Sequence, residues 1–389
     1  MSLRKRDLLG GRAAVAGIGA TEFSKDSGRS ELKLAVEAVG AALDDAGLTP
    51  ADVDGMVTFT MDTNPEITVA QAVGIGELSF FSRVHYGGGA ACATVQQAAL
   101  AVATGVAEVV VCYRAFNERS GRRFGSGVQQ REPSAEGAAL GWQLPFGLLT
   151  PASWVAMIAQ RYLHTYGLTP DAFGHVAVTD RRWAATNPAA YFHGKPITLA
   201  DHAASRWIVE PLRLLDCCQE TDGGQAIVVT SAERARDLRH PPAVIVAAAQ
   251  GAGRAQEAMT SFYRDELTGL PEMGVVARQL WQTSGLAPGD IDVGILYDHF
   301  TPFVLMQLEE FGFCGPGEAA DFVAADALPL NTHGGQLGEA YLHGMNGIAE
   351  AVRQVRGTAV NQIPGAARTL VTAGTGVPTS GLILAADEP

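Results

Sequence analysis

The chain opens with a short apolar segment and an amphipathic one. Residues 13–16 predict a strand that ends at a turn over residues 17–19, where two glycines flank an isoleucine. Residues 31–46 carry apolar side chains three and four positions apart, which predicts a helix packed on one face. Gly47 is expected to cap that helix, because glycine readily adopts a left-handed backbone. An apolar strand over residues 55–60 follows.

The same order of elements recurs in the second half of the chain. A helix ending at Ser284 is followed by Gly285, a polar turn and an apolar strand over residues 293–296. The two turns read Ala-Gly-Leu-Thr-Pro-Ala-Asp-Val-Asp and Ser-Gly-Leu-Ala-Pro-Gly-Asp-Ile-Asp, and they share a capping glycine, a proline and both aspartates. A duplicated α/β unit explains this agreement better than chance similarity over one loop.

Further strands and helices alternate in both halves. An Ala-rich helix over residues 90–104 precedes a strand over 108–112, and a strand over 243–248 precedes a helix over 305–311. Alternation of this kind predicts a largely parallel sheet in each half, covered by helices. The fold class is therefore α/β.

This pattern predicts two similar halves, an N-terminal one over residues 1–240 and a C-terminal one over residues 241–389. Within the first half, residues 115–215 differ in composition, being rich in Arg, Trp, Tyr, Pro and Gly. We expect this segment to be an inserted loop region that lies over the functional site, because long insertions in compact folds are usually functional.

Composition limits the class of protein. With 389 residues, 47% of them hydrophobic, the chain can bury a large core, and its net charge of −13 opposes nucleic acid as a general partner. No apolar run approaches the roughly 18 residues of a membrane span. The basic start lacks the apolar centre of a secretion signal, so the expected location is the cytoplasm.

The five cysteines show no paired Cys-x-x-Cys spacing, and their number is odd. Both facts oppose a disulfide framework and a structural zinc site, so reduced thiols and no metal are expected. An anionic ligand would need a local basic patch, and the clearest one is formed by Arg119, Arg122 and Arg123. A solvated loop explains these arginines equally well.

Residues 331–347 contain five glycines, two histidines and a tyrosine, and an amphipathic helix starts at their end. The glycines allow the backbone to turn tightly and to approach another group closely. Free N–H groups and the positive end of the helix dipole would lie beside Tyr341 and His343, which suits an oxyanion. The alternative is a tight connection whose polar residues only satisfy the backbone.

A second group of candidate residues follows the strand of the second repeat. Tyr297 and His299 come after residues 291–296, and Thr301 and Pro302 predict the N-cap and first turn of a helix. Both aromatic side chains are therefore expected at the carboxyl end of the sheet, where α/β proteins bind ligands. Packing at a turn is the alternative for each of them.

Glycine-rich loops before Ala90, at residues 331–347 and at residues 372–376 resemble those of the thiolase superfamily. Residues 211–224, Pro-Leu-Arg-Leu-Leu-Asp-Cys-Cys-Gln-Glu-Thr-Asp-Gly-Gly, precede an apolar run and are also similar to that family. The resemblance spans nearly the whole chain. It implies a thiolase-like fold, a duplicated α/β unit in five layers (αβαβα).

Both catalytic cysteines of the thiolase pattern are missing. The nucleophilic cysteine would fall near Gly88 or Gly89, whereas Cys92 lies about one turn further on and is expected to be a buried helix residue. The second cysteine would fall around Thr372 or Ala373. Acyl transfer through a cysteine is therefore not expected.

The two other thiolase signatures each carry a tyrosine in this sequence. The Gly-His-Pro signature falls on residues 340–342, so that its catalytic histidine is replaced by Tyr341. The Asn-Glu-Ala-Phe signature falls on residues 297–300, so that its asparagine is replaced by Tyr297.

Two segments are similar to one branch of the superfamily in particular, the branch usually labelled lipid-transfer proteins. They are residues 113–125, Tyr-Arg-Ala-Phe-Asn-Glu-Arg-Ser-Gly-Arg-Arg-Phe-Gly, and residues 331–341. The best understood members are actinobacterial retro-aldolases of steroid side-chain breakdown. The resemblance implies cleavage of a 17-hydroxysteroid with a three-carbon CoA thioester side chain into a 17-ketosteroid and propionyl-CoA.

For this reaction the resemblance implies that Tyr297 and Tyr341 act as acid and base without a covalent intermediate. A tyrosine whose pKa of about 10 is lowered by two to three units costs roughly 3–4 kcal/mol, so a tyrosine serves more easily as acid than as base. His299 and His343 are expected to assist, and hydrogen-bonded structural histidines are the alternative.

Arg122 and Arg123 are the expected contacts to CoA, which is part of the substrate, and no separate cofactor is expected. The resemblance also implies a homodimer through the thiolase-like core and a small zinc-ribbon and OB-fold partner protein, two copies of each. Three alternatives remain: another carbon–carbon reaction on an acyl-CoA, a non-catalytic acyl-CoA or lipid carrier, and a scaffold whose activity belongs to the partner.

Overall fold

The computed structural model describes residues 9–85, 87–121, 123, 137–138, 141–256, 262, 264–375 and 379–387. Its main sheet has nine strands in the order β3-β2-β4-β7-β1-β8-β11-β10-β9. These strands are β1 Ala13–Ala20, β2 Gly55–Phe59, β3 Phe80–Val84, β4 Val109–Asn117, β7 Asp222–Ser231, β8 Ala243–Gly251, β9 Val293–Ile295, β10 Arg368–Ala373 and β11 Thr379–Ala386. A small second sheet pairs β5 Trp207–Val209 with β6 Leu212–Arg213.

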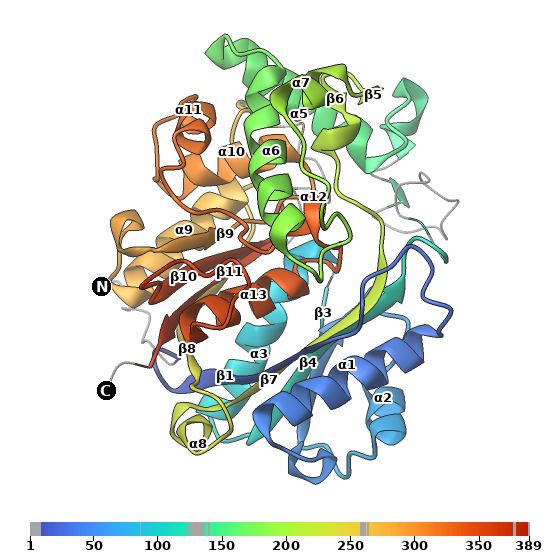
Figure 1. Cartoon of the computed structure of the whole chain (residues 1–389), viewed down its shortest axis with the longest axis vertical. Coiled ribbons are helices and arrows are strands. Elements are labelled where there is room, and N and C mark those ends of the chain that lie inside the picture. Colours follow the sequence, from blue (N-terminus) through green and yellow to red (C-terminus); the bar gives the residue numbers. More distant parts are fainter. Residues whose placement is uncertain are drawn as a thin grey trace.

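Helices cover both faces of the main sheet (Figure 1). They are α1 Glu31–Ala46, α2 Glu66–Val73, α3 Ala91–Ala103, α5 Pro151–Tyr166, α6 Asp171–Thr186, α7 Leu199–Ala204, α8 Ala232–Arg236, α9 Pro271–Ser284, α10 Thr301–Glu310, α11 Ala319–Ala324, α12 Gly335–Gly338 and α13 Met345–Arg356. No helix among these described residues is long and apolar enough to cross a membrane.

The strand order is mirrored about the junction of β1 and β8. β1 pairs antiparallel with β7 as β8 does with β11, and β2 pairs parallel with β4 as β9 does with β10. The prediction of largely parallel sheets is wrong, because β7 and β11 run against both of their neighbours. For β10 and β11 the cause is the short connection between them, since a parallel pair needs a crossover of a dozen or more residues.

The two repeated turns match in their hydrogen bonds as well as in sequence. Gly47 ends α1 with φ of 74°, and Gly285 ends α9 with φ of 73°. Asp54 accepts an N–H bond of 2.9 Å from the first residue of β4, and Asp292 accepts one of 2.8 Å from the first residue of β10. Each aspartate therefore fixes the start of a neighbouring strand in its own half.

The expected turn after residue 16 is absent, since β1 continues through both glycines. A Cβ added to Gly17 would lie 2.2 Å from the carbonyl oxygen of Ala42, and one added to Gly19 would lie 2.2 Å from the nitrogen of Ala42. The glycines therefore allow α1 to pack directly against the strand. The two glycines in this segment therefore mark a close approach of helix and strand, and not a turn.

Three helical layers enclose the two halves of the sheet. α1 and α2 lie on the outer face of the first half, and α9 packs on β8 and β11 of the second half. α3 and α13 lie between the halves (Figure 1), where their buried residues share one hydrophobic cluster with strands of both halves. This central layer carries the loops that precede α3 and α13.

The described part of the inserted segment contains three helices, α5, α6 and α7, where a loop region was expected. α5 buries Trp154, Ile158 and Tyr162 on one face, a helical periodicity that outweighed the abundance of Pro and Gly. α6 packs against α10, α11 and α12, which places it over residues 331–347. Cβ atoms added to Gly334 and Gly338 would each lie 2.5 Å from the Cβ of Ala184 in α6.

The start of α10 also differs from the prediction. The helix begins at Thr301, and Phe300 precedes it. The buried Thr301 hydroxyl donates to Asp216 over 2.7 Å instead of capping the helix, and the same carboxylate oxygen lies 2.8 Å from Nε2 of His202. Through Asp216, the hydroxyl thus connects α10 to His202 of the inserted segment.

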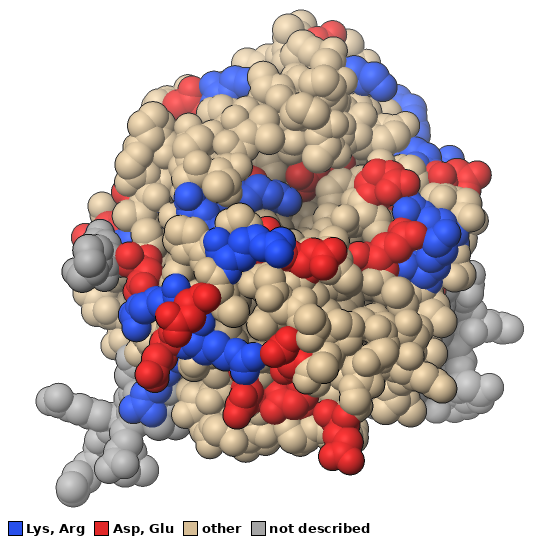
Figure 2. Space-filling view, turned by 60° about the horizontal axis from the view of Figure 1, so that its bottom comes forward, with Lys and Arg blue, Asp and Glu red and all other residues tan. Residues whose placement is uncertain are grey.

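Charged side chains of both signs are interspersed on the face drawn in Figure 2, and some border a hollow near its centre.

The five cysteines are all free, with Cys92 and Cys112 buried and the other three partly buried. The expectation of unpaired thiols is confirmed.

Candidate active site

Tyr297 and Tyr341 come together although they belong to different loops. Their hydroxyl oxygens lie 3.2 Å apart, with Tyr297 donating. The backbone N–H of Tyr297 donates to the hydroxyl of Thr372 over 2.9 Å. The hydroxyl of Thr221 holds Tyr341 from both sides, accepting from its N–H over 2.9 Å and donating to its carbonyl over 3.1 Å. These bonds hold the backbone of both tyrosines in place, and the phenol hydroxyls bond to each other.

Glycines make the space that the pair occupies. A Cβ added to Gly88 would lie 1.8 Å from the hydroxyl oxygen of Tyr297. The phenol thus fills the place of a side chain at residue 88, and the resemblance put the nucleophile near Gly88 or Gly89. A Cβ added to Gly374 would lie 2.2 Å from the Cα of Gly89, so the loop after β10 also touches this turn.

Cys92 does not take part in this cluster. It is fully buried in α3, and its thiol lies 3.7 Å from the carbonyl oxygen of Val371. Burial raises the pKa of the Cys92 thiol, which makes a thiolate less accessible. The prediction of a buried helix residue is confirmed.

His343 is a neutral hydrogen-bond donor. Its Nδ1 accepts from Nε of Arg114 over 3.0 Å, so that Nε2 carries the ring hydrogen. Burial and the nearby charge of Arg114 lower the pKa of His343 well below its usual value. A Cβ added to Gly87 would lie 2.8 Å from Nε2, which places this nitrogen beside the glycine turn. An N–H in this position suits an oxyanion.

A buried ion pair between Arg114 and Asp62 holds the arginine that bonds to His343. Nη1 of Arg114 lies 2.9 Å from Oδ2 of Asp62, and both side chains are at most 1% exposed. The guanidinium also packs on Phe116 at 4.1 Å from the ring centroid, and this ring stacks on His343 at 5.1 Å. Removing one partner of such a pair typically costs about 3–5 kcal/mol. The backbone of His343 has φ of 54°, which this support maintains.

His299 packs behind the tyrosine pair. Its ring centroid lies 4.8 Å from that of Tyr297, and its Nε2 is 3.4 Å from the hydroxyl of Thr375. Nδ1 is buried without a hydrogen-bond partner among the described residues. Burial lowers the pKa of His299 to about 3, so that the ring stays neutral.

Both phenols are neutral near pH 7. Burial raises the pKa of Tyr297 well above 10, against a smaller lowering by its bond to Tyr341. Burial also raises the pKa of Tyr341, and Tyr297 raises it further. The pair can therefore donate hydrogen bonds or a proton, whereas a resting tyrosinate is disfavoured.

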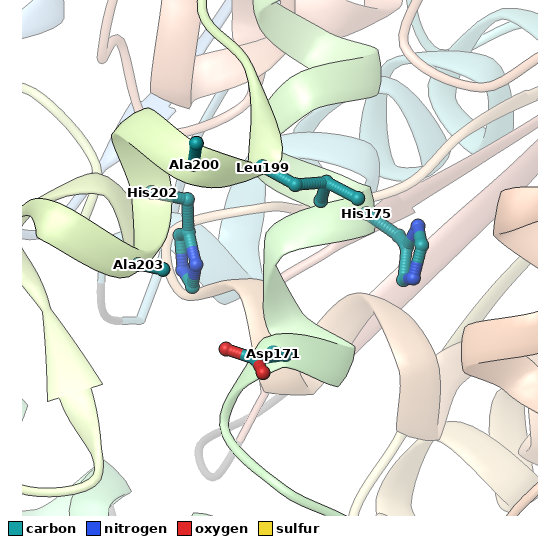
Figure 3. Close-up of a pocket in the computed structure, with 6 residues that line it drawn as sticks. All are labelled: Asp171, His175, Leu199, Ala200, His202 and Ala203. Atoms are coloured by element: carbon teal, nitrogen blue, oxygen red, sulfur yellow. The ribbon is translucent and has the colours of Figure 1, made fainter.

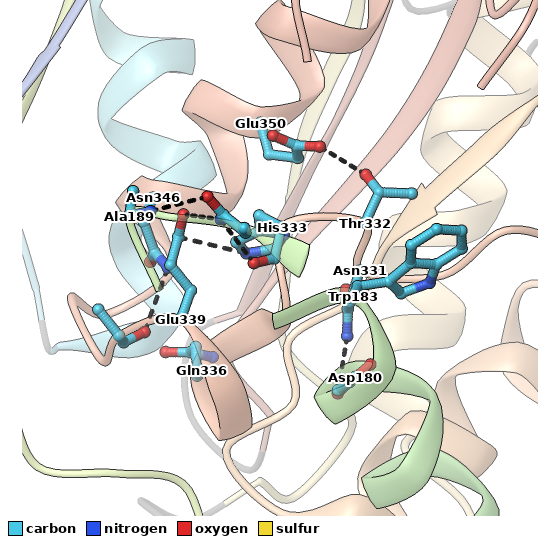
Figure 4. A network of polar contacts seen from close by, with 12 residues as sticks. Asp180, Trp183, Ala189, Asn331, Thr332, His333, Gln336, Glu339, Asn346 and Glu350 are labelled. Atoms are coloured by element: carbon cyan, nitrogen blue, oxygen red, sulfur yellow. Dashed lines mark hydrogen bonds and ion pairs between the residues drawn. The ribbon is translucent and has the colours of Figure 1, made fainter. Parts of the chain in front are cut away.

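A buried polar network holds residues 331–347 in shape (Figure 4). Asn346 donates to one carboxylate oxygen of Glu339 over 2.9 Å, and Asn187 donates to the other over 3.1 Å. The hydroxyl of Thr332 donates to Glu350 over 2.6 Å. Burial raises the pKa of Glu339 to about 7. These bonds fix the loop that carries Tyr341 onto α13.

Of the two arginines expected to contact CoA, the structure describes Arg123. Arg123 forms an ion pair of 2.6 Å with Glu220, and its side chain is 47% exposed. Arg122 lies outside the described residues. Their binding of CoA stays a prediction.

A separate pocket of about 270 Å³ lies between α6 and α7. Asp171 and His175 from α6 face Leu199, Ala200 and neighbouring residues of α7 (Figure 3). None of the four predicted catalytic residues lines this pocket.

Tyr297, Tyr341, His299 and His343 lie close together in the structure, whereas the groups around them were not predicted. Arg114 stood inside the segment 113–125 and was used only as a mark of resemblance. A single arginine within a run of buried strand residues signals a paired charge, which could have identified it. Asp62 and Thr221 had no such signal, because their partners are distant in sequence.

Comparisons with known proteins agree on one family. Residues 253–385 match the family described as thiolase C-terminal domain-like. A steroid side-chain-cleaving aldolase of Thermomonospora curvata is 69% identical over 98% of this chain and 100% of its own length. A 17-hydroxy-3-oxo-4-pregnene-20-carboxyl-CoA lyase of Mycobacterium tuberculosis is 67% identical over 97% of this chain and 100% of its own length.

A solved structure, the Ltp2-ChsH2(DUF35) aldolase, superposes with a TM-score of 0.95 at 68% identity, over 98% of this chain and 100% of the matched chain. The family match and the likeness to solved thiolases confirm the predicted thiolase-like α/β fold. The likeness to this aldolase and this lyase over nearly the full length confirms the predicted branch. The chain belongs to the steroid side-chain-cleaving aldolases of the thiolase superfamily.

Proposed function

We propose that this protein cleaves a 17-hydroxysteroid with a three-carbon CoA thioester side chain by a retro-aldol reaction, giving a 17-ketosteroid and propionyl-CoA. The observation that carries the proposal is the phenol of Tyr297 in the place of a side chain at residue 88, near the expected position of the thiolase nucleophile and 3.2 Å from the phenol of Tyr341. The names of the two relatives with 69% and 67% identity, an aldolase and a CoA lyase, support the same reaction.

The reaction needs proton transfer and no nucleophile. A base removes the proton of the 17-hydroxyl, the bond from C17 to the side chain breaks, and the electron pair enters a thioester enolate. An acid then delivers a proton to the enolate carbon. Tyr297 and Tyr341 are proposed to carry these protons, and His343 to donate its Nε2 hydrogen to the thioester oxygen.

His299 is proposed to support Tyr297 through ring packing rather than to transfer a proton, because its pKa of about 3 makes it a weak base. No cofactor beyond the CoA of the substrate is proposed, since every step moves only protons and one bonding pair. Arg122 and Arg123 are proposed as contacts of that CoA, with the ion pair to Glu220 opening as the phosphates bind.

Product analysis of the purified protein with a β-hydroxyacyl-CoA steroid tests this function. We expect ketone and the shorter acyl-CoA in equal amounts. A Claisen condensation would instead join two acyl groups into a longer β-ketoacyl-CoA with release of free CoA, and a carrier would bind the thioester and return it unchanged. Either of these two results would reject the aldolase.

We propose that the protein works in the cytoplasm as a homodimer with two copies of a small partner protein. The solved aldolase at 68% identity is a complex of Ltp2 with ChsH2(DUF35), which supports a partner of that kind. β3 lies at the edge of the main sheet with Phe81 63% exposed, an arrangement that suits pairing with a second copy.

The proposed assembly has a direct test. Native mass measurement of the co-expressed proteins should give a two-plus-two complex, and the chain alone should give a dimer. The chain without its partner should cleave the substrate more slowly, if at all. A monomeric chain, or a partner that cleaves alone, would contradict this proposal.

A further inference from the structure

Glu118 is a buried carboxyl that the proposed mechanism has not used. It directly follows β4, at the carboxyl end of that strand, and is 3% exposed. Its Oε2 has no hydrogen-bond partner among the described residues, while the backbone N–H of Thr221 stabilises the charged form of the carboxyl. Thr221 is also the residue whose hydroxyl holds Tyr341 at N–H and carbonyl. Asn117 of β4 pairs with Asp222 of β7, which brings the adjoining residues Glu118 and Thr221 beside each other. Thr221 therefore lies between Glu118 and Tyr341.

The charge of Glu118 affects the pKa of both phenols. It raises the pKa of Tyr297 and that of Tyr341 in addition to the larger effect of burial. An ionised Glu118 carboxylate therefore favours keeping both phenols protonated, and it attracts a proton that leaves them. Oε2, which has no hydrogen-bond partner among the described residues, can accept such a proton.

Other acceptors near the pair are occupied or unsuitable. Asp298 accepts the N–H groups of Gln336 and Leu337 at 2.9 Å each and shares a hydrogen bond with Asp180. Burial raises the pKa of the Cys218 thiol well above its usual value. The two histidines have lowered pKa values, and His343 presents a hydrogen rather than a lone pair to the glycine turn.

We infer that Glu118 is the proton acceptor of the retro-aldol reaction and that it acts through the tyrosine pair. The inference rests on the proposed function and replaces tyrosinate as the base. Because Glu118 acts through the phenols and does not touch the substrate, it is a positioning residue for the proton.

Protons and electrons balance in this scheme. The 17-hydroxyl gives its proton to one phenol of the pair, and the pair passes a proton to the Glu118 carboxylate. The bond from C17 to the side chain breaks, its electron pair forms the enolate, and C17 becomes the ketone carbon. The carboxyl then returns a proton through the pair to the enolate carbon, so that the carboxylate is restored without an external acid.

Neighbouring charges tune Glu118 toward this task. Burial raises its pKa well above the usual value, and the charge of Glu220 raises it further. The charges of Arg114 and Lys25 lower it. A base whose pKa lies near the working pH is the most effective one, because both of its forms are then accessible.

The pH dependence of turnover in the intact complex tests this inference. Turnover by the unchanged protein should fall on the acid side as the carboxylate becomes protonated, at a pH above its ordinary value of about 4.3. Glu118→Gln should lower kcat by about a hundredfold or more and change KM little. It should also remove the fall of turnover at acid pH, the acid limb of the pH profile. Glu118→Asp should recover part of kcat and restore the limb.

Two neighbouring substitutions provide controls with opposite signs. Glu220→Gln removes a charge that raises the pKa of Glu118, so that the acid limb should move to lower pH. Lys25→Met removes a charge that lowers this pKa, so that the limb should move to higher pH.

Each outcome decides the inference. Near-normal kcat in Glu118→Gln overturns it, and so does a loss of kcat that leaves the acid limb in place, which indicates a structural role. Near-ultraviolet circular dichroism of the variants excludes misfolding. If the unchanged protein produces no ketone, the proposed function fails; if it produces ketone and Glu118→Gln does so equally fast, only the role of Glu118 fails.

Discussion

Replacing either Tyr297 or Tyr341 by phenylalanine is expected to lower kcat at least about a hundredfold while leaving the fold intact. Each substitution removes one hydroxyl from the pair that lies 3.2 Å apart, and with it the path of the proton. The phenyl ring still fills its buried site, so that packing changes little. Steady-state kinetics of both variants, with circular dichroism as the check of folding, measures the effect.

Tyr166→Phe is a matched control for these variants. Tyr166 packs edge-on against Tyr162 at 5.0 Å, in α5 of the inserted segment, and it is not a member of the tyrosine pair. Its loss of a hydroxyl should leave kcat within about twofold. Near-normal turnover in both Tyr297→Phe and Tyr341→Phe would reject the assignment of the pair to catalysis.

Gly88→Ala is expected to abolish most of the activity through a single methyl group. The added Cβ would lie 1.8 Å from the hydroxyl oxygen of Tyr297, much closer than two such atoms can approach. The ring must therefore move, which breaks its bond to Tyr341. Displacements of about 1 Å in a catalytic group typically cost about a hundredfold in rate. Kinetics, together with a crystal structure of the variant, measures both the loss and the shift.

Gly76→Ala is the control for that substitution. A Cβ at Gly76 would meet nothing within 4 Å, and the residue lies outside the tyrosine cluster. Its activity should be unchanged. Full activity in Gly88→Ala would show that the position of the Tyr297 phenol does not matter for the reaction.

The duplicated unit and its helix caps could be predicted from local sequence. The glycines, prolines and aspartates of the two turns act on residues near them in the chain, so their pattern carries the structural meaning. The same holds for α13, whose apolar residues Met345, Ile348, Val352 and Val355 are buried as their spacing predicted.

Errors arose where a residue interacts with a distant one. Gly17 and Gly19 look like turn residues in isolation, and only the packing of α1 against β1 gives their role. The antiparallel direction of β7 depends on the path of the whole inserted segment, which local patterns do not contain.

Within the site, the family pattern located both tyrosines and both histidines, but not the groups that set their chemistry. Arg114 of β4 donates to Nδ1 of His343 and thereby sets the ring hydrogen on Nε2. Burial keeps both phenols protonated. Neither effect can be read from residue order, because protonation depends on the three-dimensional environment. The need for a base other than tyrosinate follows only once that environment is known.

The most direct test of the account is cleavage in D2O without added free CoA. The unchanged complex is mixed with a 17-hydroxysteroid that carries the three-carbon CoA thioester, and both products are analysed by mass spectrometry. A retro-aldol reaction through an enolate predicts 17-ketosteroid and propionyl-CoA in equal amounts, with one solvent deuteron on the carbon next to the thioester. A requirement for free CoA, or an acyl group bound to the protein, would contradict it.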